Sequence, residues 1–304
     1  MFFFCFFVII DVRYDIFSVV VGGSNLFYAI IVIFAGILGA VGQYLDKHLV
    51  NIKISRNDYF YYMCVSMIPF SLIMVIIEYL TGTFKFEFGF IPIVLLLIAM
   101  YLRYKKQHTI VGCLKYLNPY EDSAYLSLSI VIAFIVDVIL GVENLGLISI
   151  LSIIFTLVGV FVIADSKIKI KNLQKDLVVR ITTSLLMSYT THFMLQFWSN
   201  AVFILIVNLL LTIIFSKDYS FEYHVQHKKI IFFVFVQQIF GFSASYLSNF
   251  LSSNSVTLSS YVRPTSMVFV LIISLFYKDK DKRPTWMQIL GIVLVILGIC
   301  LIRR

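Results

Sequence analysis

Residues 115–146 read KYLNPYEDSAYLSLSIVIAFIVDVILGVENLG, and residues 147–164 continue with LISILSIIFTLVGVFVIA. The same pattern returns at 249–284 as NFLSSNSVTLSSYVRPTSMVFVLIISLFYKDKDKRP, followed by TWMQILGIVLVILGICLI at 285–302. Each copy has a polar entry, an apolar span, a short charged loop and a second apolar span with a glycine near its end. A membrane protein built from two such halves usually works at the interface between them.

The composition is that of a polytopic membrane protein. The 304 residues are 61% hydrophobic and 13% charged, with a mean hydropathy of +0.97, which a water-soluble domain of this length does not carry. The net charge of +8 comes largely from basic residues in short loops, where they orient the spans, so nucleic-acid binding is not expected. The four cysteines have neither CxxC nor metal-type spacing, and we expect no metal and no cofactor.

Stretches long enough to cross about 30 Å of hydrocarbon predict about ten transmembrane helices in two sets of five. The predicted spans are 27–47, 59–80, 88–117, 122–140 and 146–164 in the first half, and 177–195, 198–216, 229–250, 256–277 and 286–302 in the second. Because each half has an odd number of crossings, the second half enters the membrane in the opposite sense. The expected fold is therefore an all-α polytopic membrane protein made of two inverted five-helix repeats.

These spans divide the chain into four parts. An apolar segment at 1–26 precedes a first repeat at 27–164, a polar linker at 165–176 and a second repeat at 177–304. Charged residues interrupt the amino-terminal segment after about ten residues, so we expect it to lie at the membrane interface; an eleventh helix and an overlong start of translation stay open. Basic residues concentrate in the odd-numbered connections, which we expect to be cytoplasmic, and the expected location is the plasma membrane.

The order of the motifs resembles that of the drug/metabolite transporter superfamily, EamA-type. In the first half it runs from YL at 116–117 through GVE at 141–143 to GV at 159–160. In the second half, LSSYVRP at 258–264 is similar to the family's Ser-Tyr-Leu-Glu-Pro entry to helix nine, although Arg263 stands where the family usually has Glu. The resemblance implies a ten-helix carrier with a central cavity that helices of both halves line.

A basic cluster, RYKKQH at 103–108, follows an apolar run too short to cross the membrane comfortably. We therefore expect one helix to continue through the cluster to about Leu117. Arg103, Lys106 and Gln107 then fall within an arc of roughly 100° and are candidate substrate-binding residues that face a cavity. The alternative is that the cluster lies near the cytoplasmic interface, where its basic side chains reach water.

Three polar residues of the second half are further candidates for substrate binding. Superposing the halves places Gln237 opposite Arg103, with Gln238 beside it; adjacent amides in an apolar helix need a partner, which is either a neighbouring helix or a ligand. Arg263, directly before Pro264, suits a carboxylate or phosphate, or else bonds carbonyls that the proline frees. With Arg103 it suggests an anionic or zwitterionic solute.

Proton coupling needs an ionisable group in a cavity, and His192 and Asp137 are the candidates. Glu78 and the adjacent Asp46 and Lys47 are also available, but Asp46 and Lys47 are expected to pair with each other at a helix end. For each of these groups an interfacial or paired position is the simpler interpretation.

The function that these features favour is secondary transport rather than catalysis. We expect a carrier that moves a small metabolite by alternating access of its two repeats around a central cavity, with the solute and the lipid bilayer as its partners. The oligomeric state is not predicted. The alternatives are a polytopic enzyme of glycan or lipid-linked sugar metabolism, which lacks support because the chain has no HExxH motif, and a flippase for a lipid-linked substrate. A carrier requires Arg103, Gln237 and Arg263 to converge on one cavity between the halves.

Overall fold

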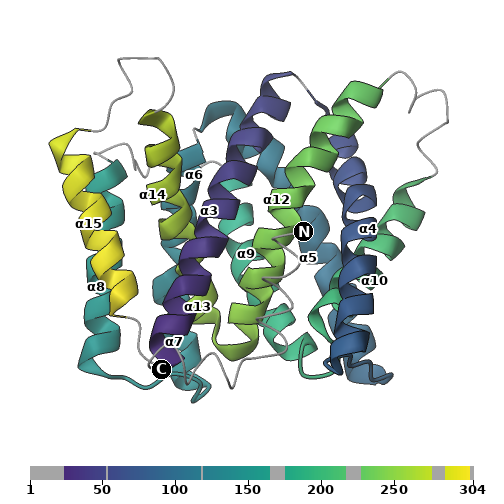
Figure 1. Ribbon diagram of the computed structural model, residues 1–304, viewed down its shortest axis with the longest axis horizontal. Coiled ribbons are helices and arrows are strands. Elements are labelled where there is room, and N and C mark those ends of the chain that lie inside the picture. The colour runs from purple at the N-terminus through teal and green to yellow at the C-terminus, as the bar shows by residue number, and fades with distance from the viewer. Residues whose placement is uncertain are drawn as a thin grey trace.

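Long apolar runs form a bundle of helices, because in hydrocarbon each backbone donor and acceptor must be paired within its own segment. The computed structural model describes residues 24–52, 54–117, 119–164, 175–216, 227–275 and 285–301. Its helices are α3 (Ser24–Asn51), α4 (Arg56–Thr81), α5 (Phe90–Tyr116), α6 (Pro119–Ser127), α7 (Ser129–Ile139), α8 (Leu147–Ala164), α9 (Lys175–Met194), α10 (Asn200–Phe215), α12 (Lys228–Asn254), α13 (Val256–Ser260), α14 (Val262–Leu275) and α15 (Trp286–Cys300). Figure 1 shows the longer helices running roughly side by side.

The all-α polytopic architecture is confirmed. Six helical stretches within the described ranges are long and apolar enough to cross a membrane, and two shorter apolar helices, α10 and α15, accompany them. Helices α5 and α9 are as long as the others but carry basic and hydroxyl side chains within their spans. The number of ten spans and the inverted relation of the two halves remain predictions.

The helix boundaries agree closely with those expected from the sequence. Helix α5 continues without a break through the basic cluster, as its short apolar run predicts. At the start of α4 the Ser55 hydroxyl accepts a hydrogen bond from the Asp58 amide at 3.0 Å, and Gly82 ends the helix with φ of 77°. Most of the predicted segment 1–26 and of the linker 165–176 lies outside the described residues.

Two of the predicted spans are broken in the same way. The predicted helix 122–140 is divided at Leu128 into α6 and α7, and the predicted helix 256–277 is divided at Tyr261 into α13 and α14. At each break the backbone N–H donates to the carbonyl three residues earlier: Leu128 to Tyr125, and Tyr261 to Leu258, both at 3.2 Å. Pro264 therefore does not lie at the break: it occupies the first turn of α14, where the missing N–H costs little.

The second apolar span of each repeated segment pairs with its counterpart, since α8 packs along α15 at one side of the bundle (Figure 1). Glycines make this close approach possible: a Cβ added to Gly159 would lie 2.7 Å from the Gly291 carbonyl oxygen. The Ser152 hydroxyl also donates to the Gly298 carbonyl at 2.6 Å. Small residues bring helix backbones together in this way within membranes.

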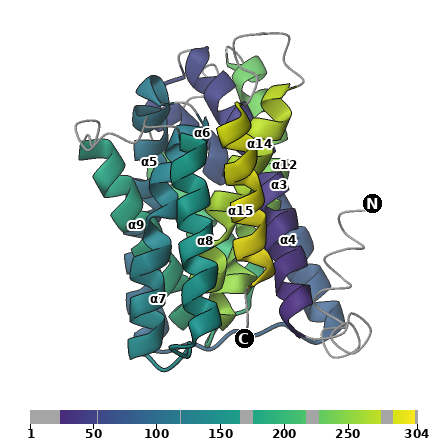
Figure 2. The ribbon, with the colours of Figure 1, turned by 90° about the vertical axis from the view of Figure 1, so that its left-hand side faces the viewer.

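The remaining helices surround the centre of the bundle. Helix α3 packs against α12 and α14, α9 packs against α5, and α4 packs against α10, so segments far apart in the chain lie side by side. Figure 2 shows α8 and α15 next to each other on the face turned to the viewer. This arrangement leaves α3, α5, α9, α12 and α14 to supply polar side chains to the interior.

Candidate functional site

A cavity of about 170 Å³ lies between helices of both halves of the chain. Its walls come from α3, α4, α5, α6, α7, α9, α10, α12, α13 and α14, and none of its lining residues belongs to α8 or α15. A site needs only about 10–15 Å³ on this scale to hold one water molecule. The cavity is therefore large enough for several waters or for a small solute.

All six predicted substrate-binding residues line this cavity. They come from two helices of opposite halves and from the start of α14: Arg103, Lys106, Gln107, Gln237, Gln238 and Arg263. As predicted, one cavity is lined by Arg103, Gln237 and Arg263. Their role in binding a solute remains a prediction.

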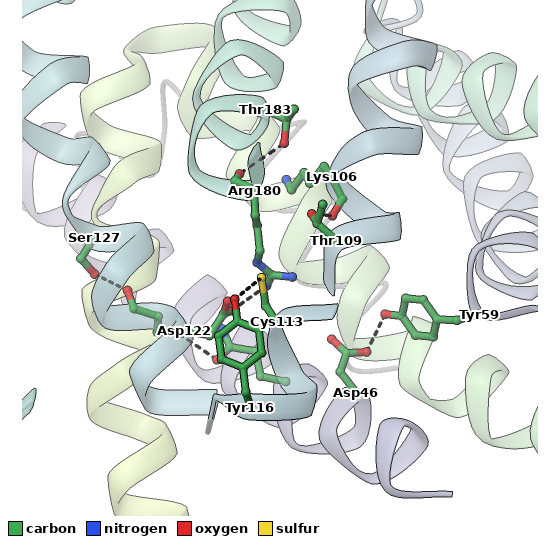
Figure 3. Close-up of polar contacts among 12 residues, drawn as sticks. Asp46, Tyr59, Lys106, Thr109, Cys113, Tyr116, Asp122, Ser127, Arg180 and Thr183 are labelled. Carbon is green, nitrogen blue, oxygen red and sulfur yellow. Dashed lines mark hydrogen bonds and ion pairs between the residues drawn. The ribbon is translucent and has the colours of Figure 1, made fainter. Parts of the chain in front are cut away.

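Sequence reasoning missed a fourth basic residue, Arg180 on α9. Its side chain is buried and its Nη2 donates to Asp122 Oδ2 on α6 at 2.6 Å, which makes an ion pair of two almost inaccessible side chains (Figure 3). Arg180 also lines the cavity, whereas Asp122 does not. The available signal was a single arginine within the run LVVRITTSLLM at 177–187.

The cavity carries an excess of positive charge. Four basic residues line it, and the charge of Lys106 interacts with those of Arg103, Arg180 and Arg263. Among the described residues that line the cavity, one has a carboxylate, Asp46. Like charges gathered in a medium of low dielectric constant repel one another strongly, so this arrangement is unfavourable without a counter-charge.

Several polar atoms around the cavity have no hydrogen-bond partner among the described residues. The donors are Nε of Arg103, Nε and Nη1 of Arg180 and Nε2 of Gln43, and the acceptors are Oε1 of Gln107 and Oε1 of Gln238. The guanidinium of Arg103 has sulfur partners, which are weak acceptors: Nη2 donates to the sulfur of Met67 at 2.6 Å, and the side chain also bonds that of Cys64. Buried polar atoms are usually paired, so these donors are available to a solute that offers acceptor oxygens.

The two adjacent glutamines of α12 bond each other rather than a neighbouring helix. Nε2 of Gln238 donates to Oε1 of Gln237, and both side chains are buried. Glycines leave space beside them, since Gly42 on α3 and Gly241 on α12 both approach the amide of Gln237. The sequence left two partners open for these amides, a neighbouring helix and a ligand. No hydrogen bond from them to a neighbouring helix is observed among the described residues.

Asp46 and Lys47 do not pair with each other, so that expectation was wrong. Oδ1 of Asp46 accepts a hydrogen bond from the Tyr59 hydroxyl at 2.7 Å, and both residues line the cavity (Figure 3). Lys47 Nζ instead donates to the carbonyls of Leu114 at 2.5 Å and Leu117 at 3.0 Å, at the end of α5. Adjacent residues on a helix do not face each other, which explains why the two side chains separate.

The two predicted proton-coupling residues lie outside the cavity lining. Asp137 is buried at the end of α7, where it accepts hydrogen bonds from Ser255 Oγ, from the amide and hydroxyl of Thr257, and from the Tyr189 hydroxyl, at 2.7–3.0 Å. Nδ1 of His192 bonds the Ser252 carbonyl oxygen at 2.7 Å. These contacts give both residues a structural explanation and do not support a role in coupling.

Glu78 has the same kind of role as Asp137. Its carboxylate accepts hydrogen bonds from the Ser199 hydroxyl at 2.6 Å, the Ala201 amide at 2.9 Å and the Tyr246 hydroxyl at 3.0 Å. It thereby ties the end of α4 to the first turn of α10 and to α12, and a carboxylate at a helix N-terminus is favourable.

Comparison with known proteins bears on the second half of the chain. Residues 179–304 match the family model described as the EamA-like transporter family, which confirms the resemblance inferred from the sequence. No curated protein matches the chain. The matched region contains most of α9 and all of α10, α12, α13, α14 and α15, and so includes Gln237, Gln238 and Arg263.

Proposed function

We propose that the chain, whose residues 179–304 match the model of the EamA-like transporter family, is a secondary carrier for a small anionic or zwitterionic metabolite. The solute binds in the central cavity, and the two halves of the chain rock around it to expose it alternately to the two sides of the membrane. No covalent chemistry is required of the protein.

The observation that carries the proposal is the charge of the cavity. Four basic side chains line it with one carboxylate, and of the four only Arg180 has a salt bridge among the described residues. Guanidinium groups bind carboxylate and phosphate oxygens through paired hydrogen bonds, and lysine adds a point charge. An anionic group that enters the cavity would both neutralise this charge and pair the free guanidinium donors.

The helix packing supports movement of one half against the other. Helix α3 of the first half packs against α12 of the second, and α9 of the second half packs against α5 of the first. The breaks at Leu128 and Tyr261 occupy matching places in the two halves. Such reciprocal pairing and broken helices are what an inverted repeat with alternating access would have.

The test is uptake into liposomes that contain the purified protein. The solutes offered would be a monocarboxylate, a dicarboxylate, a phosphate monoester, an α-amino acid and a neutral sugar. We expect uptake of one or more of the anionic or zwitterionic solutes and none of the neutral sugar. Uptake of the neutral sugar alone would contradict the proposal.

A charge-removing variant then tests the cavity itself. Arg263→Gln should lower kcat/KM for the transported solute about 10- to 100-fold, the range expected when a charged hydrogen bond is lost. The matched control is Lys105→Gln, because Lys105 is on α5 beside the cavity residues but lies over the rings of Tyr101 and Tyr104, outside the lining. If Arg263→Gln takes up the solute as well as the control does, the positive charge in the cavity does not contribute to transport.

A further inference from the structure

We propose that Asp46 takes up a proton when an anion enters the cavity, so that the carrier moves one proton with its anionic solute. The inference rests on the proposed function, because it requires that the solute be an anion. It assigns the coupling site to a residue other than His192 and Asp137, which lie outside the cavity lining.

Asp46 has the position that such a site needs. It is on α3, 8% exposed, and it is the carboxylate among the described residues that line the cavity. Among the described residues, Tyr59 alone donates to it, through one carboxylate oxygen. No hydrogen bond to the other oxygen, Oδ2, is observed among the described residues, so a proton on Oδ2 would not displace Tyr59.

The other buried carboxylates of the described segments are committed to protein donors. Asp122 is held by Arg180 at 2.6 Å, and Asp137 accepts four hydrogen bonds. Glu78 accepts three from α10 and its neighbours. Protonation of any of these groups would break contacts that hold helices together, whereas protonation of Asp46 leaves its bond from Tyr59 in place.

The surroundings of Asp46 link its charge to that of the solute. Its charge interacts with those of Arg180 on α9, Arg263 on α14 and Asp122 on α6. Helix α5 adds the cavity cations Arg103 and Lys106. Helices α12 and α13 also pack against α3 and line the cavity with amides and hydroxyls; the charges of α12, Lys228 and Lys229, are at its start and outside the lining. Helix α15 contains no charged residue.

Competition for the same cations produces the coupling. While the cavity lacks an anion, the Asp46 carboxylate partly neutralises Arg180 and Arg263. A bound anion takes over that role and also repels the carboxylate, which favours the protonated form. Thermodynamic reciprocity then requires that a proton on Asp46 strengthen anion binding by the same factor.

The test uses sulfate and methanesulfonate as probes, because neither anion titrates in the pH range of the experiment, so any proton taken up must come onto the protein. Titration calorimetry on the full-length protein, in buffers of different ionisation enthalpy, measures the protons taken up per anion bound. We expect proton uptake by the wild type and an affinity that rises as the pH falls from about 8 to about 5, with a limiting slope of about tenfold per pH unit.

Variants at this position locate the proton. Asp46→Asn keeps an acceptor for Tyr59, and it should bind sulfate without proton uptake and with the same affinity at every pH. Asp46→Glu should restore proton uptake, and Asp176→Asn, which removes a carboxylate outside the cavity at the same end of α9 as Arg180, should leave it unchanged.

The outcomes separate the two proposals. Binding of either probe without proton uptake by the wild type, or with undiminished proton uptake by Asp46→Asn, would overturn the coupling role and leave the anion carrier intact. Failure of the wild type to bind either probe at any pH would overturn the anion-binding cavity and the coupling role together. If a variant does not fold, the wild-type measurement still tests the coupling, because probe binding without proton uptake overturns it.

Discussion

The carboxylate of Asp137 and the basic cluster around the cavity are both buried charges in an apolar bundle, yet their surroundings are opposite. Asp137 accepts four hydrogen bonds from residues of two other helical segments. Arg103 and Arg180 keep guanidinium nitrogens that have no partner among the described residues. The first arrangement has all its hydrogen bonds in this conformation of the protein, whereas the second leaves hydrogen-bond donors unpaired among the described residues.

The comparison separates structural charges from functional ones better than residue type does. From the sequence, Asp137 and Arg103 are equally unexpected in apolar spans, and both were candidates for transport. A buried ion whose lone pairs or protons are all used stabilises the helices that supply its partners. A buried ion with unused hydrogen-bonding groups on a cavity wall is a candidate for solute binding.

The largest effect is expected when the complete arrangement is broken. Asp137→Ala should lower the free energy of unfolding by about 3–5 kcal/mol, because it leaves the buried donors of Ser255 and Thr257 without an acceptor. Thermal unfolding of the purified protein in detergent measures the change. Asp137→Asn, which keeps one acceptor oxygen, is the graded control and should lose less; an unchanged unfolding midpoint in both variants would contradict the structural role.

A smaller effect of opposite sign is expected at the cavity. Lys106→Met should raise the free energy of unfolding by about 1 kcal/mol, because it removes a charge that three arginines repel, while solute uptake should fall. The same change at Lys105, whose ammonium lies 5.7 Å from the ring centres of Tyr101 and Tyr104, should instead cost up to about 1 kcal/mol. If both variants lose stability equally, charge repulsion in the cavity is not the reason for the difference between the two regions.

The smallest effect is expected where a charge pair is partly exposed. Arg56 and Asp176 form a salt bridge of 2.7 Å between α4 and α9, with side chains 35% and 30% exposed. Asp176→Asn should change the free energy of unfolding by about 1 kcal/mol or less, and added salt should reduce the difference from the wild type further. Chemical or thermal unfolding at low and high ionic strength measures both; a loss as large as that of Asp137→Ala would show that exposure does not govern the value of these pairs.

The sequence predicted the helices well because their signals are local. Apolar run length placed the boundaries within a few residues, and the short run before Arg103 correctly required α5 to continue through the basic cluster. The helical period grouped Arg103, Lys106 and Gln107 on one face, and that face lines the cavity. Each of these predictions needs only hydropathy and 3.6 residues per turn.

The partners of individual charges were predicted poorly because they come from distant parts of the chain. Arg180 was missed, and its partner Asp122 is 58 residues away; Asp46 was expected to pair with its neighbour in sequence but bonds Tyr59 on the next helix. Three of the four hydrogen bonds to Asp137 come from Ser255 and Thr257, more than 100 residues later, and the fourth comes from Tyr189, 52 residues later. No local pattern indicates which helix faces meet.

Hydropathy, periodicity and the repeated segments were thus sufficient for an all-helical membrane protein, for the approximate spans and for one polar helix face. Which buried charged side chains have partners and which do not was decided by contacts between helices, such as α9 with α5 and α3 with α14. These contacts bring Arg180 and Arg263 to the cavity wall that Arg103 lines. The physical reason is that a backbone satisfies its own hydrogen bonds within each helix, whereas a buried side-chain charge is satisfied only by whatever the neighbouring helices place against it.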